Sequence, residues 1–110
     1  MSQHYFETSF QGKPATITMG WDRPLQGHFL LVETDDPGAE EEFIYSNLFD
    51  PALLEFGGLP PSLDYFKAKL TELGLNVPEP MVREIELDAI NNVGNRHVWY
   101  DQLGNIAKHA

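Results

Sequence analysis

The sequence contains no cysteine. This absence excludes disulfides, thiol catalysis, zinc–thiolate sites and iron–sulfur clusters. No apolar run approaches the roughly 20 residues that a transmembrane helix needs, and the opening segment MSQHYFETSF lacks the basic and apolar regions of a secretory signal. From these absences we expect a cytoplasmic protein that does not enter a membrane.

Basic residues are also scarce. Seven Lys and Arg residues stand against 17 Asp and Glu residues, which gives a net charge of −10. Direct binding to DNA, RNA or an anionic membrane requires local positive charge, so we expect none of these. A negative surface favours solubility, and it can also attract a basic protein partner.

The sequence does contain enough apolar material for one folded domain. Its 110 residues are 42% hydrophobic, which suffices for a core. Residues 4–10 and 15–21 each alternate between two faces and flank a turn at 11–14, a pattern typical of a β-hairpin. We expect a single domain over residues 1–103 and a loose C-terminal tail at 104–110.

A second hairpin is predicted over residues 28–46. Its arms are the apolar runs 29–32 and 43–45, and the turn sequence Asp-Asp-Pro-Gly at 35–38 lies between them. The first arm is apolar on both faces, which is typical of a strand covered on both sides. We therefore expect this arm near the middle of the sheet.

The second half of the chain predicts helices followed by a strand. Asp50 and a following proline favour a short helix, and longer helices are expected from Ser62 to about Leu73 and from Pro80 to about residue 91, with Asp88 on the polar side. Residues 96–100 form a final strand. The fold class is α+β: an antiparallel meander of four strands plus a C-terminal strand, with two or three helices on one face.

The acidic turn of the second hairpin is the first candidate site. A calcium site is one interpretation, but the spacing does not match an EF-hand loop, and a proline and a glycine interrupt it. A solvated turn and a contact with a basic protein partner remain. The residues of this candidate site are Glu33, Asp35, Asp36, Glu40, Glu41 and Glu42.

The alternative candidate is a pocket formed by Asp22, Arg23 and His97, in an enzyme or a small-ligand-binding protein. The sequence has no nucleophile elbow, P-loop or dinucleotide motif, and its histidines lack the spacing of compact metal ligands. We therefore expect no cofactor, no metal and no catalytic residues.

The leading interpretation is a small non-enzymatic protein-binding module of the inhibitor, immunity or regulatory type, which uses an acidic surface. A homodimer is a further possibility, because helices on one face leave the other face of the strand at 29–32 to be covered. A second copy, the segment 50–55 or the C-terminal tail could supply that cover. The sequence does not separate these alternatives.

Overall fold

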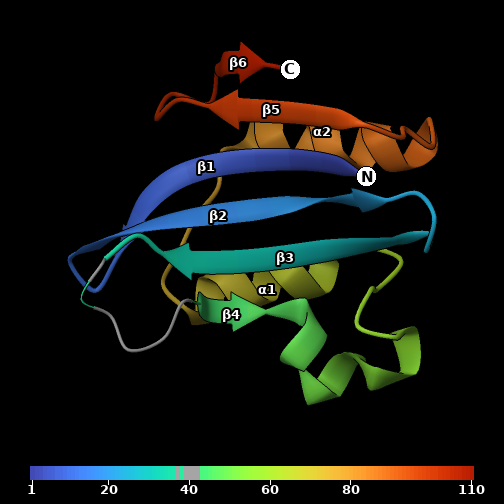
Figure 1. The fold of residues 1–110 in the computed structure, drawn as a ribbon, viewed down its shortest axis with the longest axis horizontal. Coiled ribbons are helices and arrows are strands. Elements are labelled where there is room, and N and C mark those ends of the chain that lie inside the picture. The colour runs from blue at the N-terminus through green and yellow to red at the C-terminus, as the bar shows by residue number, and fades with distance from the viewer. Residues whose placement is uncertain (37, 39–42) are drawn as a thin grey trace.

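The computed structural model describes residues 1–36, 38 and 43–110. Six strands form one twisted sheet in the order β4-β3-β2-β1-β5-β6 (Figure 1). The strands are β1 (Ser2–Phe10), β2 (Lys13–Asp22), β3 (Gly27–Thr34), β4 (Phe43–Ser46), β5 (Arg96–Tyr100) and β6 (Ile106–His109).

The predicted antiparallel meander of the first four strands is confirmed. The position of β5, which the sequence left open, is beside β1, and the two strands run parallel, so the sheet is mixed. The α2 helix lies between these parallel strands in the chain, as a parallel pair requires a crossover. β3 has a neighbour on both sides, β2 and β4.

The prediction of a single strand after the meander is incomplete. β6 pairs antiparallel with β5 and lies within the segment that was expected to be a loose tail. Asp101 holds the preceding turn, because its Oδ1 accepts hydrogen bonds of 2.9 Å from the backbone of Leu103 and Asn105. All four residues of β6 are exposed, so this edge strand has no apolar alternation by which the sequence could reveal it.

The helical segments are η1 (Asn47–Phe49), η2 (Pro51–Phe56), α1 (Asp64–Glu72) and α2 (Glu79–Ile90). Asp50 caps η2 as expected, since its side chain accepts from Ala52 N. The cap expected at Ser62 is wrong: α1 begins at Asp64, and no side chain caps it.

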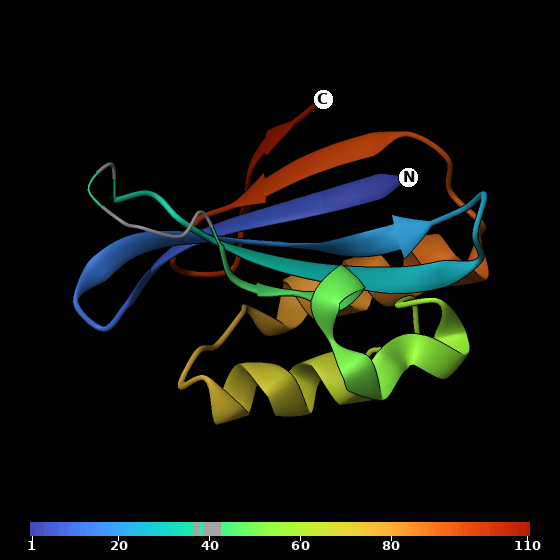
Figure 2. The same ribbon diagram turned by 60° about the horizontal axis from the view of Figure 1, so that its bottom comes forward.

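The core lies between the sheet and the two α-helices. Helix-facing residues alternate along each strand, and Figure 2 shows α1 and α2 on one side of the sheet with no helix over most of the other. Burying one large apolar side chain stabilises the fold by roughly 1.5–3 kcal/mol. The largest fully buried apolar side chains are Phe66, Ile17, Met19, Leu30, Leu53, Met81, Ile85, Val32 and Val98.

The two faces of β3 are now distinguished. Leu30 and Val32 are fully buried in the core, whereas Phe29 and Leu31 are half-buried on the side without helices. We call that side of the sheet the open face.

Within residues 1–36, 38 and 43–110, no helix combines the length and the apolar character needed to cross a membrane.

Candidate functional site

The open face carries an apolar and aromatic row that crosses the sheet. The strand register places Leu31 beside Thr18, Thr18 beside Tyr5 and Tyr5 beside Trp99, with Lys108 at the far edge. Successive residues of a strand point to opposite faces, so these partners share one face. Leu31, Tyr5 and Trp99 thus form an apolar and aromatic band with the buried Thr18 within it and Lys108 at its end.

The aromatic half of this band is held rigidly. The rings of Tyr5 and Trp99 stack with their centroids 4.7 Å apart, and Lys108 Nζ lies 4.8 Å from the centroid of the Trp99 ring. The Tyr5 hydroxyl donates to Gln3 Oε1 at 2.5 Å and therefore accepts from His97 Nδ1 at 2.9 Å. Rings fixed in this way lose little entropy when a partner covers them.

An apolar hollow of about 410 Å³ lies at the other half of the band. The ring of Phe29 lies over Gly20, where an added Cβ would stand 2.9 Å from the Phe29 Cζ. Glycine at this position therefore lets the ring approach the β2 backbone closely. The hollow is lined by Met1, Gln3, Thr18, Asp22, Leu25, Phe29, Leu31, Ser46, Asn47, Leu48 and Leu59.

Acidic side chains border the band on one side. Glu33, Thr16 and Glu7 occupy the next row of the register, and Thr16 Oγ1 donates to Asp35 Oδ2 at 2.8 Å. Partial burial raises the pKa of Tyr5, and the charge of Glu33 raises it further. Glu33 is therefore close enough for its field to act on the aromatic band.

The acidic turn itself divides into parts with different surroundings. Lys13 Nζ lies 2.9 Å from Asp36 Oδ2, and this lysine holds the pKa of Asp36 below its usual value. Asp36 is therefore partly neutralised, while Glu33 and Asp35 border the open face. Glu40, Glu41 and Glu42 lie outside the described residues.

Asp88 of α2 lies far from Asp35 of this turn. Asp35 N bonds Pro14 O at one end of β2, whereas Ser2, which contacts Asp88, pairs with Trp21 near the other end. At about 3.3 Å per residue, the two places are roughly 23 Å apart along the strand. Asp35 and Asp88 therefore do not share one patch.

The three residues of the alternative pocket have separate contacts. Asp22 Oδ1 accepts from Leu25 N at 3.1 Å and so holds the turn after β2. Arg23 lies against Gly94, between α2 and β5, while His97 contacts Tyr5 on the open face. Across the described chain, no hydrogen bond or ion pair joins any two of the three.

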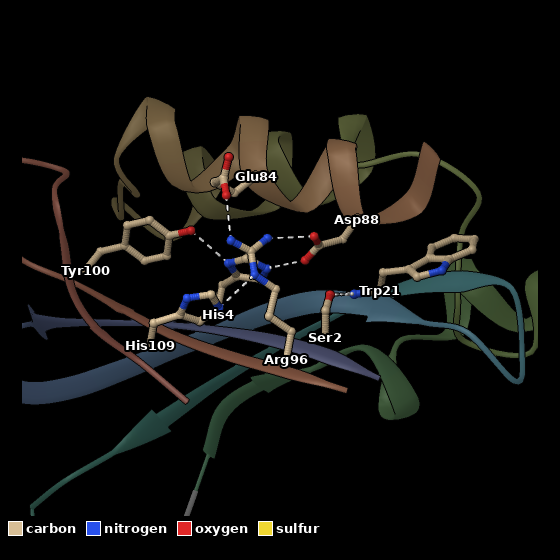
Figure 3. Close-up of polar contacts among 8 residues, drawn as sticks. All are labelled: Ser2, His4, Trp21, Glu84, Asp88, Arg96, Tyr100 and His109. Carbon is tan, nitrogen blue, oxygen red and sulfur yellow. Dashed lines mark hydrogen bonds and ion pairs between the residues drawn. The ribbon is translucent and has the colours of Figure 1, made fainter. Parts of the chain in front are cut away.

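A buried polar cluster lies between α2 and the sheet (Figure 3). His4 Nε2 is 2.6 Å from Asp88 Oδ2, and His4 Nδ1 is 2.8 Å from the Tyr100 hydroxyl. Arg96 donates to Asp88 Oδ1 at 2.7 Å and to Glu84 Oε1 at 2.6 Å. The cluster thus joins β1, β5 and α2.

The electrostatics of the cluster explain how a charge is tolerated there. Burial alone would raise the pKa of Asp88, but hydrogen bonds from His4 and Arg96 outweigh this effect and hold the pKa below its usual value. The side chains of His4 and Asp88 are 0% and 3% exposed, so a substrate cannot touch them. We interpret the cluster as a structural tie between helix and sheet.

Sequence reasoning placed Asp88 on the polar side of its helix, and this placement is wrong. Asp88 is 2% exposed, and Met81 and Ile85 are 0% exposed. The spacing of these positions, four residues and then three, places all of them on one helix face. That spacing was the available signal that an acid lies on the buried stripe and needs a partner.

The residues of the hollow had a weaker signal. Met1, Leu25 and Leu48 come from the N-terminus, the β2–β3 turn and η1, and the topology brings them together. Of these features, the sequence indicated only that Phe29 and Leu31 alternate with core residues along their strand.

Comparison of the chain with protein-family models, with curated proteins and with solved structures finds no match. The proposal for its function therefore rests on the geometry described above.

Proposed function

We propose that the protein is a non-enzymatic protein-binding module that binds a partner carrying basic and apolar side chains on its open sheet face. The observation that carries this proposal is the pairing of two adjacent rows on that face. One row is apolar and aromatic, from Leu31 to Trp99, and the next is acidic, with Glu33 and Glu7.

The chemistry of the two rows indicates the kind of partner. Tyr and Trp are the side chains that most often anchor protein interfaces. The acidic row and the net charge of −10 favour a basic partner, because complementary charge accelerates association and rejects acidic competitors. An apolar side chain of the partner fits the hollow beside Phe29 and Leu31.

A second copy of the chain suits this face less well. The same acidic row would be present on both copies, and each copy carries a charge of −10. Like charges brought together in an interface oppose association. The proposed partner is therefore a different protein, with basic residues placed to meet Glu7 and Glu33.

Site-specific photo-crosslinking tests this proposal. A photoreactive residue at Leu31 or Trp99 reports on the open face, while one at Leu54 or Leu87, which are 76% and 47% exposed elsewhere, serves as the matched control. We expect both open-face positions, and neither control, to crosslink the same basic protein, with a yield that falls as salt is raised.

Two results would refute it. Crosslinks of the same yield from all four positions would indicate collisions rather than a binding face. A product with twice the chain mass of 12.5 kDa as the sole open-face crosslink would identify a second copy as the occupant.

A further inference from the structure

A separate groove lies on the helix side of the molecule, between the start of α1 and the last turns of α2. Its volume is about 330 Å³. It does not share a residue with the open face, so it is independent of the proposed function. Its lining residues are His28, Pro61, Ser62, Leu63, Asp64, Lys67, Glu86, Ala89 and Ile90.

His28 is the buried polar side chain of this groove, with only 3% of its surface exposed. His28 Nδ1 lies 3.3 Å from Pro60 O, and because a carbonyl only accepts, Nδ1 carries the proton. Nε2 is then an acceptor, and it has no hydrogen-bond partner among the described residues. Buried polar atoms without partners are rare, and each calls for an explanation.

The surroundings of His28 define what could bind there. Burial lowers the pKa of His28 despite the nearby Glu86, so the ring is neutral at neutral pH and Nε2 offers a lone pair. Asp64 and Glu86 supply two carboxylates against the single cation of Lys67. His28 Nε2 therefore lacks a hydrogen-bond donor, and the groove has an excess of negative charge.

A metal ion is not the best fit for this groove. A bare ion needs several ligands at about 2 Å. Within the part of the chain that the structure describes, no three His, Asp or Glu side chains are placed to hold one. A larger cation that carries its own N–H donors can reach His28 and both carboxylates even when these groups do not converge closely on one point.

We propose that this groove binds a primary ammonium group on a short alkyl chain. The ammonium donates to His28 Nε2, the carboxylates of Asp64 and Glu86 balance its charge, and the alkyl chain lies on Leu63 and Ile90. A lysine side chain of a partner and a free alkylamine share this chemistry. Lys67 competes with the ligand for the same carboxylates.

Long-range ¹H–¹⁵N NMR of the histidine rings tests the proposal directly on the intact wild-type protein. The probes are n-butylammonium, n-butanol and butyrate, which differ in charge and in donor. We expect n-butylammonium alone to shift His28 Nε2 saturably in the millimolar range. His97, on the opposite face, is the internal control and should not move.

Two variants test whether the charges of the groove contribute to binding. Glu86→Gln should weaken the binding of n-butylammonium about threefold, and Lys67→Met should strengthen it by a similar factor. Glu55→Gln on η2, away from the groove, is the matched control. A blocked lysine tripeptide separates the two ligand sources: binding at least as tight as that of the free amine assigns the groove to a protein side chain, and binding of the free amine alone assigns it to a small metabolite.

The proposal would be overturned by a His28 resonance that does not respond to n-butylammonium. It would also be overturned if n-butanol gave the same shift and affinity, or if Glu86→Gln and Lys67→Met left the affinity unchanged. None of these results would affect the open-face proposal, which depends on residues of the other face.

Discussion

His4 and Asp88 are 84 residues apart in the sequence and are joined by a contact of 2.6 Å in the interior. This contact links β1, at the beginning of the chain, to α2, near its end. Arg96 on β5 binds the other oxygen of the same carboxylate, so a single acid connects three elements. The contact therefore ties α2 to the two strands on the helix side of the sheet.

Asp88→Ala should therefore destabilise the fold by about 3–5 kcal/mol, because it leaves the buried His4 without its carboxylate and the partly buried Arg96 with Glu84 alone. The free energy of unfolding in urea measures this effect. Glu86→Ala, on the exposed side of the same helix, is the matched control and should change stability by less than about 0.5 kcal/mol. Equal effects of the two substitutions would refute the structural role of the cluster.

Gly20→Ala tests the close approach of backbone and ring at the open face. An added Cβ would stand 1.9 Å from Ser2 O and 2.9 Å from Phe29 Cζ, so β1 and the Phe29 ring would both have to move. We expect a loss of at least about 3 kcal/mol by thermal or urea unfolding. Gly38→Ala, whose nearest atom would be 3.5 Å away, is the control, and a similar loss there would contradict the argument.

His28 should make stability depend on pH. Its pKa in the folded protein lies below the ordinary value of 6.5, so the unfolded chain binds the proton more readily. The contribution of neutral His28 to the free energy of unfolding is therefore fully present above pH 6.5. It is lost as the pH falls from 6.5 towards the pKa of His28 in the folded protein. Urea unfolding of wild type and His28→Gln over this range should show a smaller pH dependence in the variant; identical slopes would contradict the assignment.

Tyr5 and Trp99 should carry much of the affinity for the partner identified by crosslinking. The double substitution Tyr5→Ala with Trp99→Ala should weaken binding by at least about 2 kcal/mol, or roughly thirtyfold. Leu54→Ala with Leu87→Ala removes exposed apolar side chains elsewhere and should leave the affinity unchanged. Calorimetry with purified partner distinguishes these outcomes, and circular dichroism checks that both variants fold.

The sequence predicted the elements with strong local signals. The meander, the strand at 96–100 and the cap at Asp50 all depend on alternation, turn residues or capping within a few positions, and each is present. The same alternation assigned Phe29 and Leu31 to one face and Leu30 and Val32 to the other, but it could not say which face the helices cover.

The features that the sequence did not predict depend on contacts between residues that are far apart in the sequence. The parallel pairing of β1 with β5 and the partner of Asp88 are both set by packing across most of the chain length. β6 is exposed and carries no periodic pattern, so its pairing with β5 leaves no local signal. The apolar hollow likewise brings together residues from the N-terminus, the β2–β3 turn and η1.

The most direct test of the open-face proposal is an NMR titration of the protein with the crosslinked partner, followed at the Leu31 methyl groups and the Trp99 indole. We expect these signals to shift or broaden saturably, and those of Leu54 and Leu87 to remain in place. The reverse pattern, with changes at Leu54 and Leu87 alone, would place the partner elsewhere and contradict the proposal.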